Sequence, residues 1–215
     1  MNDETLDETR LRLAAELPNH AAFDGWSATA VNAAADALGV NRDVAQLAFG
    51  GSAVAMIDAW FAHIDAAMLA MLTPDALGAL KVRARITALV EARLRLIAPH
   101  KEALRRALAM LAFPTNAVTS AKLGWRAADV MWRAAGDTAT DYNHYTKRAI
   151  LGSVYAATLT VFLNDESTDH ADTRAFLARR IEGIMRFEKA KASFVARSDL
   201  AFSPTRFLGR LRYPA

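Results

Sequence analysis

The densest group of chemically active side chains in the sequence lies between Asp129 and Leu151. This segment, DVMWRAAGDTATDYNHYTKRAIL, holds one Trp, two Tyr, one His, three acidic and three basic residues around a single predicted turn. Carboxylates close to a histidine are the groups that general acid–base catalysis and metal binding use. The composition therefore predicts a site of catalysis or of recognition, and the rest of the sequence decides between the two.

The rest of the sequence offers little for catalysis. It has no cysteine, which excludes thiol nucleophiles, disulfides and zinc-thiolate sites. It also lacks a GxGxxG segment, a phosphate-binding loop and a GxSxG segment. The histidines are scattered along the chain, at His20, His63, His100, His144 and His170.

Metal-ligand spacing is also missing. No Glu-x-x-His pair occurs, which argues against a di-iron carboxylate bundle. Glu166 and His170 are four residues apart, but they lie in a segment rich in Asp and Thr, where a helix cap explains them better than a metal site. We expect a protein that is not an enzyme and that holds no cofactor or metal.

Almost every segment that could position these residues is predicted to be helical, because Ala, Leu and Arg dominate and strand-like alternation is absent. Proline and glycine supply the breaks: the first helix is expected to stop before Pro18 and the second at Gly39. The predicted helices cover about residues 4–17, 27–38, 41–49, 53–72, 73–98, 101–112, 115–135, 142–163 and 168–193.

The helices at 27–38 and 41–49, with a helix on each side, have the pattern of a helix-turn-helix. A helix-turn-helix followed by a large helical bundle is the layout of TetR-type regulators. We therefore predict an all-α, TetR-like fold in three parts. These are a helix-turn-helix-like unit over 1–72, a ligand-binding bundle over 73–193, and a tail over 194–215 with a short basic amphipathic segment.

The charge distribution argues against DNA binding by the first unit. Residues 1–80 hold three basic and eleven acidic residues, whereas residues 81–215 hold 23 basic and twelve acidic residues. Duplex binding needs several Lys or Arg in each module to neutralise phosphates. The predicted recognition helix offers only Asn41, Arg42 and Gln46 to base edges, so we expect no nucleic-acid partner. A ligand-sensing TetR-type regulator and a plain structural scaffold remain the alternatives.

A membrane contact is predicted at the end of the chain. No uninterrupted run of about 18 apolar residues occurs, and the longest apolar-leaning segment is expected at 149–163. The acidic N-terminus has no leader pattern. The basic amphipathic segment FSPTRFLGRLRYP is typical of an interfacial helix on anionic lipid, the alternative being an unstructured tail. The candidate membrane contacts are Phe207, Leu208, Arg210, Leu211 and Arg212.

From residue 25 onward, over about 170 residues, the chain resembles the coenzyme Q biosynthesis family called Coq-nine. Three stretches carry the resemblance: GWSATAVNAAADALGV at 25–40, VEARLRLIAPHKEALRRALAMLAFPTN at 90–116, and the segment 129–151. The last is the most specific, with its Met-Trp, Ala-Gly-Asp and Thr-Asp-Tyr-Asn-x-Tyr-Thr-Lys-Arg-Ala elements.

The resemblance implies a TetR-like fold without DNA binding. It also implies a lipid-binding accessory protein that binds isoprenoid quinone intermediates and presents them to the demethoxyubiquinone hydroxylase. The expected location is cytoplasmic and peripheral to the inner membrane, and a homodimer is expected. The hydroxylase-facing surface would include Asp129, Met131, Asp141, His144, Tyr145 and Arg148. The mitochondrial members of the family have Trp where this chain has His144, so a flat apolar contact is replaced by a titratable one.

Small and apolar residues are the candidates for a lipid cavity. On the predicted helix 142–163, small residues recur, and they either leave room for a ligand tail or allow close helix packing or a dimer interface. The candidate lipid-binding residues are Met110, Leu111, Phe113, Trp132, Gly152 and Ala156. Taken singly, such residues are more often part of a core, and Asp141, Lys147 and Arg148 are also compatible with a helix N-terminus and a solvated basic face.

Overall fold

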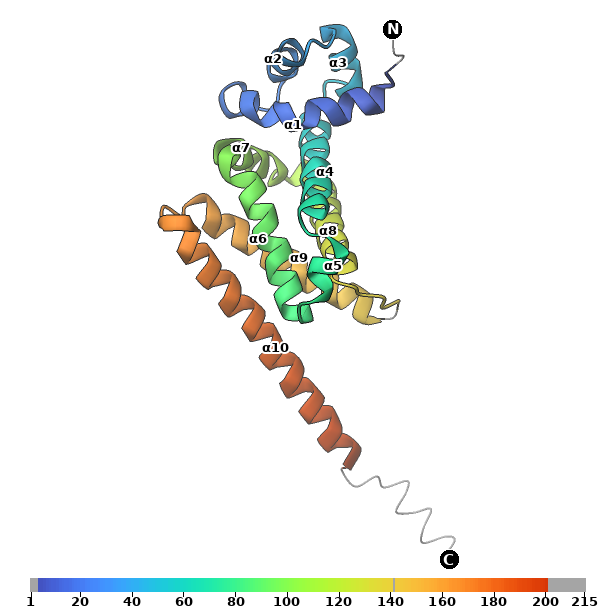
Figure 1. The fold of residues 1–215 in the computed structure, drawn as a ribbon, viewed down its shortest axis with the longest axis vertical. Coiled ribbons are helices and arrows are strands. Elements are labelled where there is room, and N and C mark those ends of the chain that lie inside the picture. The colour runs from blue at the N-terminus through green and yellow to red at the C-terminus, as the bar shows by residue number, and fades with distance from the viewer. Residues whose placement is uncertain (1–3, 141, 201–215) are drawn as a thin grey trace, which may run out of the picture. The chain divides into compact units, whose positions relative to one another are not determined.

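The computed structural model describes residues 4–140 and 142–200, and within them it is built of helices without strands (Figure 1). The all-α prediction is confirmed. The chain divides into two units, residues 1–177 and 178–215. The helices are α1 Leu6–Asp24, α2 Ala28–Leu38, α3 Arg42–Phe49, α4 Ala53–Met71, α5 Pro74–Gly78, α6 Val82–Ile97, η1 Ala98–His100, α7 Lys101–Leu111, η2 Pro114–Asn116, α8 Ala117–Ala134, α9 Tyr142–Leu163, η3 Thr168–His170 and α10 Ala171–Leu200.

The boundaries of α2 and α3 follow from side-chain caps. The hydroxyl of Ser27 accepts from the Ala30 amide, and the side-chain oxygen of Asn41 accepts from the amides of the first turn of α3. Gly39 and Gly50 end the two helices with φ of 64° and 55°, in the left-handed region that favours glycine. The helix-turn-helix expected from the sequence is therefore formed as predicted.

Helix α1 is longer than the sequence predicted. It continues through Pro18 to Asp24 and ends at Gly25, whose φ is 69°. A proline inside a helix removes its own amide hydrogen bond, and its ring crowds the carbonyl four residues earlier. The ring of Pro18 is buried, so packing offsets these costs. The prediction that α1 stops before Pro18 is wrong, because it considered only the tendency of proline to end a helix and not the tertiary packing of the Pro18 ring.

The helix-turn-helix is fixed to the bundle through α1, which packs against α2, α3, α4 and α7. The indole nitrogen of Trp26 donates to the Ala103 carbonyl at 3.1 Å, and its ring lies 5.3 Å from that of Trp60 on α4. Arg10 donates from Nε to the carbonyl of Ala48 at the end of α3, at 2.7 Å. The boundary predicted at residue 72 falls inside the unit 1–177.

Helix α4 is the apolar centre of this unit. By length and composition alone it could cross a membrane, with a mean hydropathy of 1.4. The expectation that 149–163 is the longest apolar-leaning segment is therefore wrong. Asp58 and Asp65 interrupt the apolar residues of α4, but the mean hydropathy of the helix stays high. In the structure α4 packs against α1, α6 and α8, and Asp65 forms a buried ion pair with Arg93 of α6. These contacts are those of a core helix.

The single helix predicted over 73–98 is broken into α5 and α6. The side chain of Arg85 holds the break: its Nε donates to the Leu80 carbonyl at 2.8 Å and its Nη2 to the Gly78 carbonyl at 3.1 Å. These carbonyls would otherwise lack partners at a helix end. The third contact of Arg85, from Nη1 to the Ala135 carbonyl at 2.9 Å, reaches the loop after α8.

Candidate functional site

Helices α8 and α9 lie side by side and carry the segment singled out in the sequence (Figure 1). A Cβ built on Gly152 of α9 would stand 3.6 Å from the Gly124 carbonyl oxygen and 3.9 Å from the Ala128 Cβ of α8. These are ordinary van der Waals distances, so Gly152 faces the surface of α8 and not open space. The loop between them, residues 135–140, turns at Gly136, whose φ is 88°.

A network of ion pairs joins the two helices beneath this loop. The guanidinium of Arg148 on α9, which is 2% exposed, contacts Asp129 of α8 at 2.5 Å and Asp137 of the loop at 3.1 Å. Arg133 binds the other oxygen of Asp129 at 2.8 Å, and Lys147 binds Asp137 at 2.6 Å. The three segments are therefore held in one arrangement by charge-assisted hydrogen bonds.

The carboxylates of this network are held in their charged forms. Burial alone would raise the pKa of Asp129, but hydrogen bonds from Arg148 and Arg133 outweigh it, and the pKa lies below its ordinary value. Burial likewise opposes the hydrogen bonds that Lys147 and Arg148 donate to Asp137, and the pKa of Asp137 is also lowered. Groups held in this way are suited to fixing a loop, and neither carboxyl is poised to exchange a proton near neutral pH.

Above the network, three rings form a partly exposed cluster that we term the aromatic patch: Trp125, His144 and Tyr145. The ring of Trp125 lies 6.3 Å from that of His144 and 6.0 Å from that of Tyr145, and the latter two are 5.1 Å apart in an edge-on arrangement. Tyr145 is 61% exposed and Trp125 is 37% exposed. Partly exposed aromatic rings on a rigid support are typical of protein–protein contact sites.

A cavity of about 460 Å³ opens beside the aromatic patch. The loop residues 137–140 line it together with Arg133, His144, Tyr145 and Arg148. His144 is oriented by a contact of 2.9 Å between its Nδ1 and the carbonyl of Ala139 in the loop. The patch and the loop therefore form one concave surface whose shape depends on the ion pairs below it.

The structure brings together most of the predicted partner surface, but with different roles. His144 and Tyr145 reach the surface, whereas Met131 is fully buried, so its placement on the surface is corrected to the core between the helices. Arg148 is also buried and supports the surface from below. Asp141 lies outside the described residues, as do the predicted membrane contacts Phe207, Leu208, Arg210, Leu211 and Arg212.

Trp125 is a member of the patch that the sequence pattern did not reveal. It stands seven residues before Trp132, which places both on a similar side of α8, but nothing in the sequence distinguishes their roles. In the structure Trp132 faces α9: its Nε1 donates to the Lys147 carbonyl at 3.0 Å, and the Lys147 ammonium lies 5.4 Å from its ring. Trp132 anchors the helix pair and Trp125 carries the exposed ring.

The predicted lipid-binding residues are not gathered in one place. Leu111 is buried and Met110 half-buried, while Phe113 is 62% exposed at the corner between α7 and α8. Gly152 meets α8, and Ala156 is exposed on α9. Other side chains line the cavities beside the aromatic patch, between α6 and α10, and between α1 and α4. The role of the predicted residues in binding lipid stays a prediction.

The small residues of α9 point in more than one direction. Gly152 contacts α8, whereas Ala149, Ser153 and Ala156 are exposed to solvent. Gly152 therefore lies against α8 and leaves no open space for a ligand on that side. The exposed residues are where a dimer interface was expected, and the homodimer stays a prediction.

Comparison with known proteins places this helix pair in a family. The COQ9 family model matches residues 117–188, which include all of α8, the loop and α9. Rat ubiquinone biosynthesis protein COQ9, mitochondrial, is 34% identical over 192 residues, covering 86% of this chain and 60% of that protein. The human protein of the same name is 33% identical over 192 residues, covering 86% of this chain and 59% of its own length. The chain belongs to the COQ9 family.

The resemblance carried by residues 129–151 is thereby confirmed, and the aromatic patch lies within the matched COQ9 region. The chain spans about 60% of the length of the rat and human COQ9 proteins. A crystal structure of a TetR transcriptional regulator from Nitrosomonas europaea is similar to this COQ9 chain with a TM-score of 0.64 and 23% identity. That likeness covers 80% of this chain and 95% of the regulator, and it confirms the TetR-like fold.

Proposed function

We propose that this protein is a non-catalytic, lipid-binding accessory protein of ubiquinone biosynthesis. In this proposal it binds isoprenoid quinone intermediates and presents them to the demethoxyubiquinone hydroxylase, at the inner membrane to which it is peripherally bound. The names of the rat and human relatives support the pathway. The observation that carries the accessory role is the aromatic patch, which is exposed, rigidly supported and part of the matched COQ9 region.

The ion pairs below the patch support a role in binding rather than in chemistry. Asp129 and Asp137 are the carboxylates of this network, and both are committed to Arg148. A general acid or base must have a pKa near the working pH, whereas the pKa values of these two groups are lowered. A docking surface instead requires fixed side chains, because ordering them on binding would cost affinity.

The TetR-type regulator is the alternative, and the contacts of α3 argue against it. The side chain of Asn41 is used as the cap of α3. Arg42 is ion-paired with Asp36 at 2.5 Å, and the amide of Gln46 donates to the Asn32 side chain at 2.7 Å. The residues that could reach base edges are thus already engaged, in a half of the chain with a large excess of acids.

Loss of the Tyr145 ring is expected to weaken binding to the hydroxylase. Tyr145→Ala removes the most exposed ring of the aromatic patch without touching the ion pairs, so the dissociation constant should rise roughly tenfold or more. The measurement is biolayer interferometry with the purified demethoxyubiquinone hydroxylase. Tyr142→Ala is the matched control, because Tyr142 is 77% exposed on the same helix and is not part of the patch. Equal affinities for the two variants would contradict docking at the patch.

The lipid part of the proposal predicts that the protein carries an isoprenoid quinone when purified. Mass spectrometry of an organic extract should detect it, and Phe113→Ser should reduce the amount recovered, because an exposed apolar ring at a helix corner is suited to contact a lipid tail. Phe23→Ser is the control, since Phe23 is 84% exposed on α1, far along the chain from this corner. Repeated extracts without quinone or other lipid would favour a scaffold protein.

A further inference from the structure

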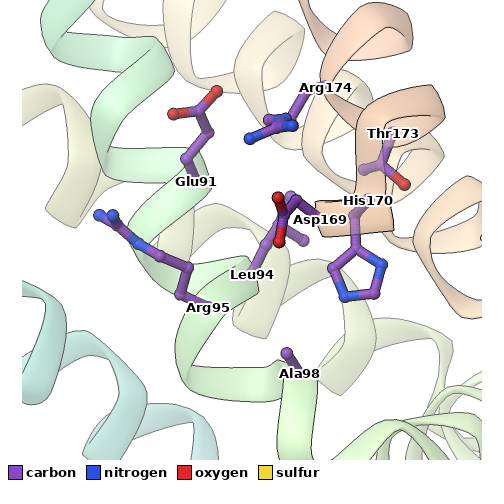
Figure 2. Close-up of a pocket in the computed structure, with 8 residues that line it drawn as sticks. All are labelled: Glu91, Leu94, Arg95, Ala98, Asp169, His170, Thr173 and Arg174. Carbon is purple, nitrogen blue, oxygen red and sulfur yellow. The ribbon is translucent and has the colours of Figure 1, made fainter. Parts of the chain in front are cut away.

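A second cavity, of about 390 Å³, lies between α6 and the start of α10, and we term it the α6–α10 pocket (Figure 2). Its volume is within the range of small-molecule sites and exceeds what a single ion needs. Neither the aromatic patch nor the predicted lipid-binding residues contribute to it. Its lining residues are Glu91, Leu94, Arg95, Ala98, Asp169, His170, Thr173 and Arg174.

The wall of the pocket on the α10 side is held rigidly by a buried carboxylate. Asp165 accepts hydrogen bonds from the amide and hydroxyl of Ser167 at 2.9 and 2.5 Å, and from the amide and hydroxyl of Thr173 at 2.8 and 2.5 Å. Burial would raise the pKa of Asp165, but these hydrogen bonds hold it well below its usual range. The segment between them, with Asp169 and His170 at φ of 53° and 54°, keeps an uncommon left-handed backbone.

His170 is fixed in one tautomer when it is neutral. The ammonium of Lys101 lies 3.4 Å from its Nδ1, and an ammonium can only donate, so Nδ1 must accept. The proton is then on Nε2, which is left as a donor. The ring also packs edge-on against Phe162, with centroids 4.8 Å apart. The pocket therefore has a positioned N–H donor beside its charged groups.

Four charged side chains of the pocket have no hydrogen bond or ion pair with other described residues: Glu91, Arg95, Asp169 and Arg174. Figure 2 shows Glu91 and Arg174 on the same side of the pocket and Asp169 near its centre, whereas the guanidinium of Arg95 extends outward at the rim. Two acids and two arginines give a pocket without net charge but with both signs exposed. The best electrostatic complement is a ligand that also carries one positive and one negative group.

We propose that the α6–α10 pocket binds a small zwitterion that carries a phosphodiester and a primary ammonium group, as glycerophosphoethanolamine does. Arg174, with His170, would bind the phosphodiester, because a guanidinium group matches phosphate oxygens in pairs. Glu91 and Asp169 would bind the ammonium group, which has three protons to donate. Leu94 and Ala98 provide the apolar floor for the carbon spacer. The same chemistry occurs in a free metabolite and in the headgroup of phosphatidylethanolamine.

Isothermal titration of the full chain with glycerophosphoethanolamine tests the proposal. The zwitterion is expected to bind at least tenfold more tightly than inorganic phosphate or ethanolamine alone, because each of these satisfies only one half of the pocket. Glu91→Gln and Arg174→Gln should each weaken binding about fivefold or more. Arg83→Gln is the matched control, since Arg83 is exposed on α6 and does not line the pocket. Far-UV circular dichroism checks that the variants are folded.

The two sources of the ligand are separated with vesicles. Preference for phosphatidylethanolamine over phosphatidylcholine vesicles, lost in Glu91→Gln, would identify a lipid headgroup, because the trimethylammonium group of phosphatidylcholine has no proton to donate. Binding of free glycerophosphoethanolamine without that preference would identify a soluble ligand. Equal binding of inorganic phosphate and the zwitterion, or no binding of either probe in solution or on vesicles, would overturn the proposal. None of these results depends on hydroxylase binding.

Discussion

Arg148→Ala is expected to lower the free energy of unfolding by about 3–5 kcal/mol, the range for removing one partner of a buried ion pair. Arg148 is 2% exposed and is shared between Asp129 and Asp137, which are 19% and 6% exposed. Its loss would leave two desolvated carboxylates, with only Arg133 and Lys147 to compensate them. Urea denaturation followed by circular dichroism measures the change.

Arg133→Ala is the control for this variant. Arg133 contacts the same Asp129 but is 72% exposed, so solvent screening limits its contribution to about 1 kcal/mol or less. The effect of Arg148→Ala should also depend on pH. The pKa values of Asp129 and Asp137 are lowered in the folded protein, so their stabilisation is present above the unfolded value of about 3.9 and is lost as the pH falls below it. Similar losses for both variants at neutral pH would refute the buried network.

Asp65→Ala is expected to lower the free energy of unfolding by a similar amount, about 3–5 kcal/mol, because it leaves a buried cation unpaired. It leaves the guanidinium of Arg93, 2% exposed at the centre of the bundle, without a carboxylate partner. The ring of Tyr155, 5.0 Å from the guanidinium, offers only partial compensation. Differential scanning calorimetry should show a lower melting temperature.

Asp58→Ala is the matched variant on the same helix. Asp58 is paired with Arg126 but is 48% exposed, so its removal should change the stability by about 1 kcal/mol or less. If Asp65→Ala were as mild as Asp58→Ala, the charge of Arg93 would have to be solvated, and α4 would not be the dry centre of the bundle. Replacing Asp65 and Arg93 together by apolar residues should recover part of the loss.

Local signals in the sequence predicted the helices well wherever a cap or a left-handed glycine decided the boundary. Ser27, Gly39 and Asn41 set the ends of α2 and α3, and α9 begins and ends at the predicted Tyr142 and Leu163. The predictions failed where side-chain burial or side-chain hydrogen bonds decided the boundary. Burial keeps α1 helical through Pro18, and the bonds of Arg85 stabilise the break between α5 and α6.

The sequence predicted which segment holds the site, but not which of its side chains contact one another or reach the surface. The density of polar and aromatic residues pointed to 129–151, and the family resemblance identified its relatives. Arg148 and Asp129 are 19 residues apart on different helices, so no helical spacing could reveal their contact. The orientation of α8 about its own axis turns Met131 toward the core and Trp125 toward solvent. Neither outcome can be read from residue type alone.

The four tryptophans make the protein its own spectroscopic reporter. The ring centroids of Trp26, in the turn between α1 and α2, and Trp60, on α4, are 5.3 Å apart. The two rings should couple electronically and give a near-ultraviolet circular dichroism signal that vanishes when the helix-turn-helix separates from the bundle. Trp125, partly in water, should emit at longer wavelength and respond when a partner covers the patch. In unlabelled protein, the circular dichroism signal therefore reports loss of the fold, and the tryptophan emission wavelength reports binding of a partner at the aromatic patch.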